Sequence, residues 1–164
     1  MKNFIIFKEI NKTGIIHLNR PEALNALNLE MAEDFLKQLK KWQMDNNILR
    51  VLLTGEGKAF CAGGDIKSMF LSSKVSNLKK NFLFKEYTLN YAISQFTKPY
   101  LSIWNGIVMG GGVGLSVYGS TRIASEKSRF AMPETGIGFF PDVGGSYFLS
   151  RISKGIGLYL GLTG

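Results

Sequence analysis

Short apolar runs alternate with helical repeats along this 164-residue chain, and this alternation constrains its fold more than any other feature. The chain opens with two apolar runs separated by Asn-Lys-Thr-Gly at residues 11–14, the pattern of a β-hairpin. From Asn28 the apolar period becomes that of an amphipathic helix. The next run, RVLLTGEG, ends in glycine, as expected of a strand covered on both faces. Because strands and helices keep alternating, the sequence predicts an α/β domain with buried strands.

The same criteria give the bounds of the expected elements. The predicted buried face of the first helix consists of Ala32, Phe35, Leu36, Leu39 and Trp42. Asp65 is the predicted N-cap of a short helix. We further expect a mobile loop at residues 72–80, helices at about residues 81–95, 143–151 and 155–162, a strand at residues 99–106, a glycine loop opening a helix at residues 109–120, and one strand or a strand pair at residues 121–132.

The composition fits one soluble globular domain over residues 1–164, since 45% of the residues are hydrophobic and 20% are charged. The single cysteine, Cys61, excludes an internal disulfide, and one cysteine with one histidine cannot form a Cys/His metal site. We therefore expect a reducing compartment and no bound metal. His17 lies in a strand pattern and Cys61 lies between apolar neighbours, so a half-buried structural histidine and a packed thiol are favoured over catalytic roles.

The charge balance favours a polyanionic partner. Twenty Lys and Arg residues against twelve Asp and Glu residues give a net charge of +8. This charge suits nucleic acid, an anionic membrane or a phosphorylated small molecule, and it does not choose among them. No apolar run approaches the roughly 20 residues that span a bilayer. The N-terminal segment has the pattern of a strand and not of a transit peptide, so no targeting segment is visible.

Glycine-rich loops at residues 61–65, 109–114 and 136–145 each follow an apolar strand or end at a predicted helix start. Helix N-termini leave backbone N–H groups unpaired, and these groups bind anions and developing oxyanions. The functional interpretation is that the N–H groups of Gly64 and of the run at residues 110–112 hold a carbonyl oxygen that becomes negative. The alternative is that the glycines only shape turns and close helix packing.

Two acids, Glu134 and Asp142, stand in the apolar segment MPETGIGFFPDVGG at residues 132–145. Such surroundings raise the cost of ionising a carboxyl group, so an acid there is usually hydrogen-bonded, a helix cap or a participant in chemistry. Asp142 precedes a predicted helix and is a candidate N-cap. Glu134 follows a proline and precedes Thr-Gly, so an exposed turn glutamate is the alternative to a catalytic acid.

Three motifs, LNRPEALNALN, KAFCAGGDIKSM and the long run from NGIVMGGGVGLSV to FPDVGGSYFLSRI, resemble the crotonase (enoyl-CoA hydratase/isomerase) superfamily. They occur in the family's order, and the resemblance covers essentially the whole chain. It is closest to the branch that hydrolyses 3-hydroxyisobutyryl-CoA, through MGGGVGLSV and MPETGIGFFPDVGG. The resemblance implies a crotonase-like α/β fold with a ββα-type spiral core and an acyl-CoA substrate.

The resemblance also implies roles for individual residues. The backbone N–H groups of Gly64 and Gly111 would form the oxyanion hole, with Glu134 as the main catalytic acid and Asp142 as its partner. Glu86 would line the substrate pocket. The remaining residues implied to contact substrate or CoA are Glu22, Ala23, Leu24, Ala62, Gly63 and Asp65. The basic residues Lys74, Lys79 and Lys80 are most simply a solvated face, although they would also suit CoA phosphates.

Gly114 separates two branches of this superfamily. Hydratases similar to this chain place a second glutamate at that position, two residues after the glycine triplet, and use both acids to add water across a double bond. Glycine has no side chain that transfers a proton, so this mechanism is disfavoured here. Hydrolysis of the thioester remains, with Glu134 either attacking the carbonyl to form an anhydride or activating a water.

The implied function is hydrolysis of 3-hydroxyisobutyryl-CoA to 3-hydroxyisobutyrate and CoA, a step of valine breakdown. It needs no cofactor, because CoA is part of the substrate. The expected partner is the acyl-CoA, with no nucleic acid or membrane, and a homo-oligomer is compatible. The resemblance implies the mitochondrial matrix; without a visible transit peptide, the cytoplasm stays open.

Enzymes of this branch are considerably longer and continue into a C-terminal helical portion, which this chain is expected to lack. Three alternatives therefore stay open. One is an enoyl-CoA hydratase or isomerase, and another is an acyl-CoA-binding module without turnover. The third, a basic nucleic-acid-binding domain, is motivated only by the charge of +8.

Overall fold

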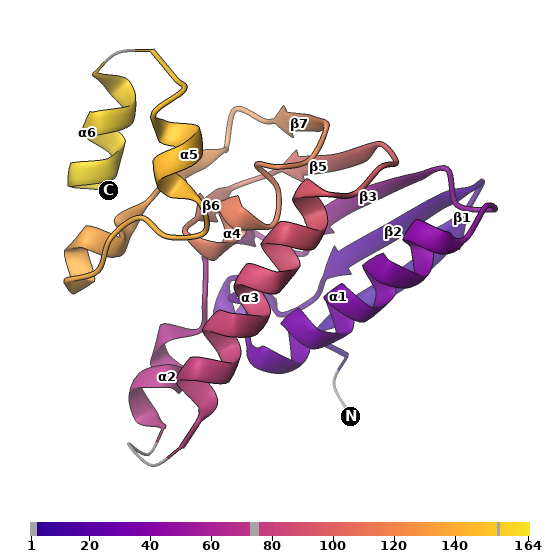
Figure 1. The fold of residues 1–164 in the computed structure, drawn as a ribbon, viewed down its shortest axis with the longest axis horizontal. Helices are drawn as coiled ribbons and strands as arrows, with labels where there is room; N and C mark the ends of the chain where they lie inside the picture. The colour runs from indigo at the N-terminus through magenta and orange to yellow at the C-terminus, as the bar shows by residue number, and fades with distance from the viewer. Residues whose placement is uncertain (1–2, 73–75, 154) are drawn as a thin grey trace.

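Two β-sheets with helices packed beside them make up the fold (Figure 1). The computed structural model describes residues 3–72, 76–153 and 155–164. The larger sheet has the strand order β1-β2-β3-β5-β7, and the smaller sheet has the order β4-β6-β8. The strands are β1 (Ile5–Ile10), β2 (Thr13–Leu18), β3 (Arg50–Gly55), β4 (Ala59–Cys61), β5 (Tyr100–Trp104), β6 (Ile107–Met109), β7 (Thr121–Ala124) and β8 (Arg129–Ala131). The helices are η1 (Pro21–Ala23), α1 (Leu29–Met44), α2 (Ile66–Leu71), α3 (Leu78–Ser94), α4 (Gly111–Gly114), η2 (Pro133–Ile137), α5 (Gly145–Leu149) and α6 (Ile156–Thr163).

The predicted N-terminal hairpin is confirmed. Strands β1 and β2 pair in antiparallel register from Ile5 opposite Leu18 to Ile10 opposite Thr13. The two residues of the turn, Asn11 and Lys12, have φ angles of 48° and 61°, which give the backbone twist that a two-residue hairpin turn requires. The other strand pairs of both sheets are parallel.

Helix α1 begins and buries its side chains as predicted. The side chain of Asn28 accepts a hydrogen bond from the backbone N–H of Met31 at 2.9 Å, which caps the helix N-terminus. At the other end, the ammonium of Lys98 donates to the carbonyl oxygens of Trp42 and Asp45, which the helix itself leaves unpaired. The predicted apolar residues Ala32, Phe35, Leu36, Leu39 and Trp42 are all buried, together with Met31.

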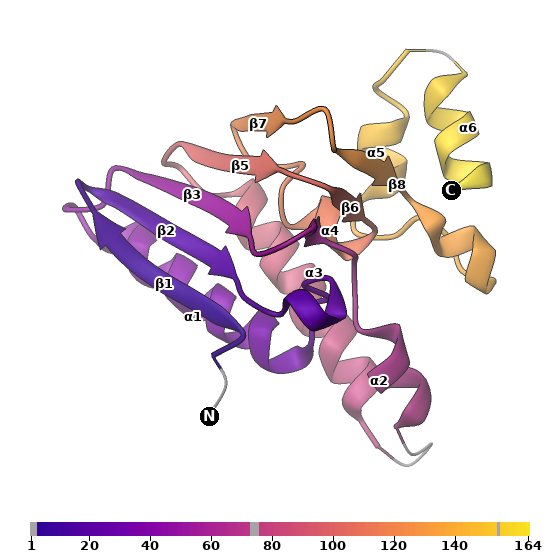
Figure 2. The ribbon, with the colours of Figure 1, turned by 180° about the vertical axis from the view of Figure 1, so that it is seen from behind.

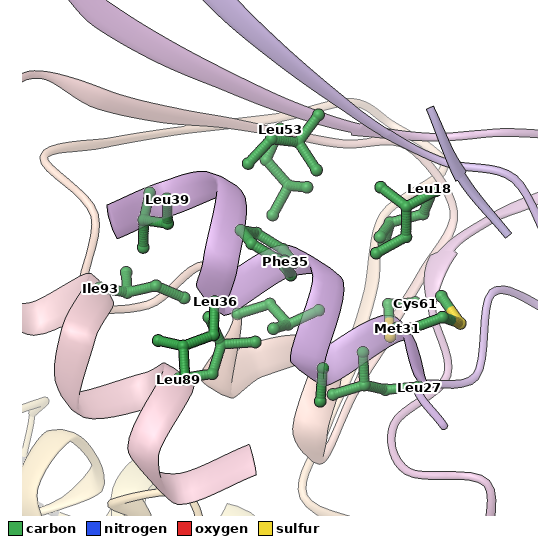
Figure 3. Close-up of a cluster of buried hydrophobic side chains, with 14 of the residues drawn as sticks. Leu18, Leu27, Met31, Phe35, Leu36, Leu39, Leu53, Cys61, Leu89 and Ile93 are labelled. Carbon is green, nitrogen blue, oxygen red and sulfur yellow. The ribbon is translucent and has the colours of Figure 1, made fainter. Parts of the chain in front are cut away.

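Helices α1 and α3 cover the same face of the larger sheet, as the two opposite views show (Figures 1 and 2). In the core between these layers, Phe35 lies on the side of the sheet near Leu53, and Leu36 lies on the side of α3 near Leu89 (Figure 3). Because the helices lie on one face, β3 alternates between buried and partly exposed side chains. The prediction that the run RVLLTGEG is covered on both faces was therefore wrong.

Several boundaries differ from the prediction. Helix α3 starts at Leu78, inside the segment predicted as a loop, because the hydroxyl of Ser76 accepts from the N–H of Leu78 and supports the first turn. Residues 73–75, which include Lys74, lie outside the described residues, whereas Lys79 and Lys80 are exposed in that first turn. The segment 121–132 forms two strands, β7 and β8, which belong to different sheets. Helix α4 contains only Gly111–Gly114.

The smaller sheet positions the functional segments. Its three strands are parallel, with Cys61 opposite Val108 and Met109 opposite Ala131. Their carboxyl ends therefore lie at one edge of the sheet, the usual place for a ligand site in parallel α/β structures. The glycine loop after β4, helix α4 after β6 and helix η2 after β8 all begin at this edge. Helix α6 packs against η2 and against α5.

No helix in the described ranges combines the length and the apolar character that crossing a membrane requires.

Phe35→Ala is expected to lower the free energy of unfolding by about 3 to 5 kcal/mol, because it leaves a cavity between the sheet and α3. Phe35 is fully buried, with 0% of its surface exposed. Urea denaturation followed by circular dichroism measures the change. Asp34→Ala, at the exposed neighbouring position of the same helix, should leave the stability nearly unchanged. Equal stability of the two variants would contradict this placement of α1.

Candidate active site

The carboxyl ends of the smaller sheet open into a cavity of about 210 Å³. Backbone atoms of residues 62–64 and 110–111 form part of its wall. Three carboxylic acids line it, namely Glu86 from α3, Glu134 from η2 and Asp142 from the loop before α5. The apolar lining includes Ile66, Met69, Phe82, Leu83, Ile137 and Phe139. A small apolar cavity that combines backbone amides with three acids has the features of an active site.

The two predicted amides lie next to each other. A parallel bridge pairs Leu27 with Gly64, and its hydrogen bonds use the carbonyl of Gly63 and the N–H of Asp65. The N–H of Gly64 itself therefore points away from Leu27. On that other side, the position that a Cβ of Gly111 would occupy lies 3.2 Å from the nitrogen of Gly64. Within the described residues, neither the N–H of Gly64 nor that of Gly111 has a backbone acceptor.

Gly110 and Gly111 are required because a side chain at either position would fill the space beside the two amides. A Cβ on Gly111 would collide with Oε1 of Glu86, and a Cβ on Gly110 would lie 2.5 Å from Oε1 of Glu134. Gly110 also has a φ of 48° and Gly63 a φ of 104°, which favour glycine. The interpretation that these glycines only shape turns is therefore incomplete, because they also keep the space beside the amides open.

Glu86 belongs to the buried face of α3. It shares this face with Phe82, Leu89, Asn90 and Ile93, and only 3% of its surface is exposed. Its Oε1 atom has no hydrogen-bond partner among the described residues. Burial, and then the charges of Asp142 and Glu134, raise the pKa of Glu86 to about 8, so the neutral acid predominates at pH 7. Glu86 thus lines the cavity, as predicted.

Glu134 is buried, which excludes the alternative of an exposed turn glutamate. The residue lies in η2 and exposes 9% of its surface, and its Oε2 atom has no partner among the described residues. Burial, with a further contribution from the charge of Asp142, raises the pKa of the Glu134 carboxyl group above its ordinary value. A carboxylate with a raised pKa is a stronger base, which suits proton transfer near neutral pH.

Asp142 is held by a tyrosine and is not a helix cap. The hydroxyl of Tyr87 donates to its Oδ2 atom at 2.7 Å. Burial raises the pKa of Asp142, and this hydrogen bond partly opposes the increase. The N-cap of α5 is Gly144, without a side-chain hydrogen bond to the helix. The capping alternative was therefore wrong, because the chain makes a turn at Val143 and Gly144 before the helix begins.

Asp65 does not line the cavity and instead supports its wall. Its carboxylate accepts from the N–H and the hydroxyl of Ser68 at 3.0 and 2.8 Å, which confirms the predicted N-cap of α2. Arg20 forms an ion pair with it at 2.8 Å. Burial alone would raise the pKa of Asp65, but the bonds from Ser68 and Arg20 outweigh it and lower the pKa. Direct contact of Asp65 with a substrate is not supported by this arrangement.

The two segments predicted to lie along CoA are joined by their backbones. The N–H of Ala62 donates to the carbonyl oxygen of Leu24 at 3.0 Å. Ala62 and Gly63 line the cavity, whereas Glu22 and Ala23 belong to the turn η1 and do not line it.

Leu24 lines a second hollow, of about 600 Å³, whose basic side chains the sequence analysis missed. These side chains are Lys58, Lys127 and Arg129, which come from the amino-terminal side of the smaller sheet. Lys58 lies far from Lys127 and Arg129 in the sequence. Only the alignment of β4 with β6 and β8 brings them together.

Two polar residues of α3, Tyr87 and Asn90, were also missed, and both line a groove next to the cavity. The sequence analysis gave Tyr87 no role, whereas its hydroxyl contacts Asp142, 55 positions away. The amide group of Asn90 is buried and has no hydrogen-bond partner among the described residues. A polar residue on an apolar helix face was the available signal for Asn90.

Gly114 has no room for a larger residue. A Cβ at this position would lie 2.8 Å from Cβ of Val143 and 2.9 Å from Nδ2 of Asn90. A second glutamate of the hydratase type would require both neighbours to move. The structure therefore agrees with the expectation that two-glutamate hydration is disfavoured.

His17 and Cys61 have structural positions, as predicted. The ring nitrogens of His17 pair with Thr54 at 2.8 Å and Glu56 at 3.0 Å on the larger sheet. Cys61 is fully buried, and burial raises the pKa of its thiol to about 12, so the reactive thiolate is suppressed. Among the described residues, no group of three or more His, Cys, Asp and Glu side chains is arranged to hold a metal.

Comparisons with known proteins agree with this geometry. Residues 13–164 match the family model described as enoyl-CoA hydratase/isomerase. A relative from Danio rerio named "3-hydroxyisobutyryl-CoA hydrolase, mitochondrial" is 54% identical over 98% of this chain, and one of the same name from Xenopus laevis is 56% identical over 92%. These matches span 42% and 40% of the relatives' own lengths. A solved carnitinyl-CoA dehydratase from Mycobacterium thermoresistibile superposes with a TM-score of 0.94 at 41% identity, over 98% of this chain and 48% of that one.

Glu86→Gln is expected to change how stability depends on pH. The pKa of Glu86 is raised from 4.5 to about 8 in the folded protein. Between these values the folded state keeps a proton that the unfolded state has lost, so the wild-type free energy of unfolding falls as pH rises, by up to about 1.4 kcal/mol per pH unit. The variant should lack this part of the slope.

Urea denaturation at several pH values between about 5 and 8 measures the difference between variant and wild type. Glu126→Gln, at an exposed position, serves as the control and should keep the wild-type slope. Identical slopes for Glu86→Gln and wild type would show that Glu86 is not a buried neutral acid.

Proposed function

The chain belongs to the enoyl-CoA hydratase/isomerase family, and we propose that it binds an acyl-CoA and hydrolyses its thioester, with 3-hydroxyisobutyryl-CoA as the substrate. One observation carries this proposal: the adjacent amides of Gly64 and Gly111 have no backbone acceptor among the described residues, and they open onto a cavity that contains the buried Glu134. The substrate identity rests on the names of relatives about half identical to this chain.

The amide pair supplies the electrostatic part of catalysis. With the thioester oxygen between the N–H groups of Gly64 and Gly111, both donate to the negative charge that develops when the carbonyl carbon is attacked. Donors fixed in the backbone need no reorientation during the reaction, and each is worth about 3 to 4 kcal/mol in comparable oxyanion holes. The apolar lining keeps water from competing for the same oxygen.

Glu134 supplies the nucleophile by one of two routes. In the first, its carboxylate attacks the carbonyl carbon, the C–S bond breaks, CoA leaves as a thiolate, and water then hydrolyses the resulting anhydride. In the second, Glu134 takes a proton from a water whose oxygen attacks the same carbon, the C–S bond breaks, and the proton passes from Glu134 to the leaving thiolate. Its burial and raised pKa suit both routes.

The other two acids have different proposed tasks. Glu86, protonated at neutral pH, donates a hydrogen bond inside the cavity and avoids a third negative charge there. Asp142 orients Glu134 or the substrate hydroxyl. Since like charges close together disfavour ionisation, one neutral acid among the three makes the group easier to accommodate.

CoA would run from the cavity past Ala62 and Leu24 to the basic hollow of Lys58, Lys127 and Arg129. Ammonium and guanidinium groups suit the phosphates of CoA. The positive charge of the chain is therefore assigned to binding of CoA and not of a nucleic acid. The relatives' names support the proposal of a mitochondrial location.

A hydratase or dehydratase is the second candidate, and the high structural similarity to a carnitinyl-CoA dehydratase favours it. The packing of Asn90 and Val143 around Gly114 disfavours hydration by two glutamates, because it leaves no room for the second one. An acyl-CoA-binding module without turnover is the third.

Glu134→Gln is expected to lower release of free CoA thiol from 3-hydroxyisobutyryl-CoA by about 10²- to 10⁴-fold, because the amide is neither a base nor a nucleophile. A thiol-reactive dye measures release by wild type, by this variant and by Asp142→Asn. The exposed control Glu126→Gln should retain wild-type rates.

Crotonyl-CoA serves as the second substrate of the same assay. Hydration of crotonyl-CoA without thiol release would support hydratase activity in place of thioester hydrolysis. Tight acyl-CoA binding by wild type with no turnover would support the binding module. Thiol release that survives Glu134→Gln would overturn the proposed mechanism.

Gly111→Ala is expected to lower thiol release at least 100-fold, because a methyl group there occupies the space beside the N–H of Gly64 and displaces Glu86. Gly136→Ala is the matched control, since a Cβ at Gly136 meets nothing within 4 Å. Steady-state kinetics, with circular dichroism to confirm folding, compares the two. Equal activity would exclude Gly111 from the oxyanion hole.

A further inference from the structure

Two tyrosine hydroxyls contact the loop that carries Asp142. The hydroxyl of Tyr87 on α3 donates a hydrogen bond to Oδ2 of Asp142 at 2.7 Å. Within the described residues, this is the hydrogen bond that the Asp142 carboxyl group receives from another side chain. Tyr118, which follows α4, donates to the backbone oxygen of the next residue, Val143, at 2.6 Å. One hydroxyl thus holds the side chain of Asp142, and the other holds the backbone beside it.

The backbone beside Asp142 has a conformation that its sequence disfavours. Val143 has a φ of 43°, in the left-handed region that a β-branched residue rarely adopts. Such a conformation persists only where surrounding contacts hold it. The bond from Tyr118 is one of these contacts, and it depends on Gly144, because a Cβ there would collide with the Tyr118 hydroxyl. The N–H of Gly145 donates to the carbonyl oxygen of Asp142 and closes the turn.

The loop separates two spaces. Asp142 lines the catalytic cavity, whereas Val143 and Gly144 line a neighbouring groove of about 660 Å³ together with Tyr87 and Tyr118. The direction of the Asp142 side chain therefore decides whether its carboxyl group faces the cavity or the groove. Tyr87, with 39% of its surface exposed, reaches Asp142 from the groove side.

We propose that Tyr87 and Tyr118 are positioning residues that hold the carboxylate of Asp142 in the catalytic cavity. The proposal rests on the function proposed above, and it adds residues that do not touch the reacting atoms. The acids facing Asp142 are Glu86 from α3 and Glu134 from η2. The charge of Asp142 and the charges of these two acids disfavour one another. The hydroxyl of Tyr87, together with the backbone of Asp142 itself, stabilises the Asp142 carboxylate.

Tyr87→Phe tests the proposal, because it removes the hydroxyl and keeps the ring. The expected result is a roughly 10- to 100-fold lower kcat/KM for thiol release, the range for loss of a hydrogen bond to a charged group, with the loss mainly in kcat. The acidic limb of the pH–rate profile should move to higher pH, since the carboxylate of Asp142 loses a donor that lowers its pKa. Tyr118→Phe should lower kcat through the backbone.

Tyr91→Phe is the matched control. Tyr91 lies one turn further along α3 and lines the same groove. Within the described residues, its hydroxyl makes no hydrogen bond to the Asp142 loop. Its substitution should leave kcat/KM and the pH profile unchanged. A purely structural role of Tyr87 would lower stability without moving the pH profile.

Carboxyl ¹³C NMR titration of Asp142, assigned with Asp142→Asn, provides a readout that does not need turnover. The pKa of Asp142 should rise in Tyr87→Phe and stay unchanged in Tyr91→Phe. An unchanged pKa in Tyr87→Phe overturns the proposal, whether or not the wild type hydrolyses thioesters. Absence of thiol release by wild type, with the expected NMR shift, would instead reject the proposed function and keep the positioning role.

Discussion

The parallel pairing of β4, β6 and β8 is the constraint on which the candidate site depends. Each strand has only three residues, and their alignment brings three distant segments to one edge. The loop after β4 contributes Gly64, the turn after β6 contributes Gly111, and η2 after β8 contributes Glu134. A shift of one residue in this register would turn each following segment to the other face of the sheet and separate the two amides.

Burial of acids is the main energetic cost in this arrangement. Three carboxyl groups line one cavity of about 210 Å³, and removal from water disfavours the charge on each of them. The structure limits this cost in different ways. Glu86 is held neutral at pH 7, and Asp142 receives a hydrogen bond from Tyr87. Glu134 has one oxygen without a partner in the described part of the chain, which is the expected state of a group that acts on a substrate.

Absent side chains are as important to the site as present ones. Gly111 leaves room beside the amide of Gly64, and Gly114 leaves room for Asn90 and Val143. The first glycine keeps open the space of the proposed oxyanion hole. The second distinguishes the proposed thioester hydrolysis from two-glutamate hydration, because the space for the second acid is already filled.

The sequence by itself determined the hairpin, the strands β3 and β5, the amphipathic helix α1, the N-cap of α2, and the glycine and acid segments of the site, since turn residues, caps and apolar periods are local signals. It did not reveal the separate small sheet, whose strands are too short for a periodic pattern, or the partly exposed face of β3. Only the tertiary structure decided that Glu86 is a buried neutral acid, that Asp142 is held by Tyr87 and does not cap α5, that Asp65 supports the wall, and that Lys58, Lys127 and Arg129 share one hollow. These properties depend on neighbours and on water exclusion across long sequence separations, which no local pattern encodes.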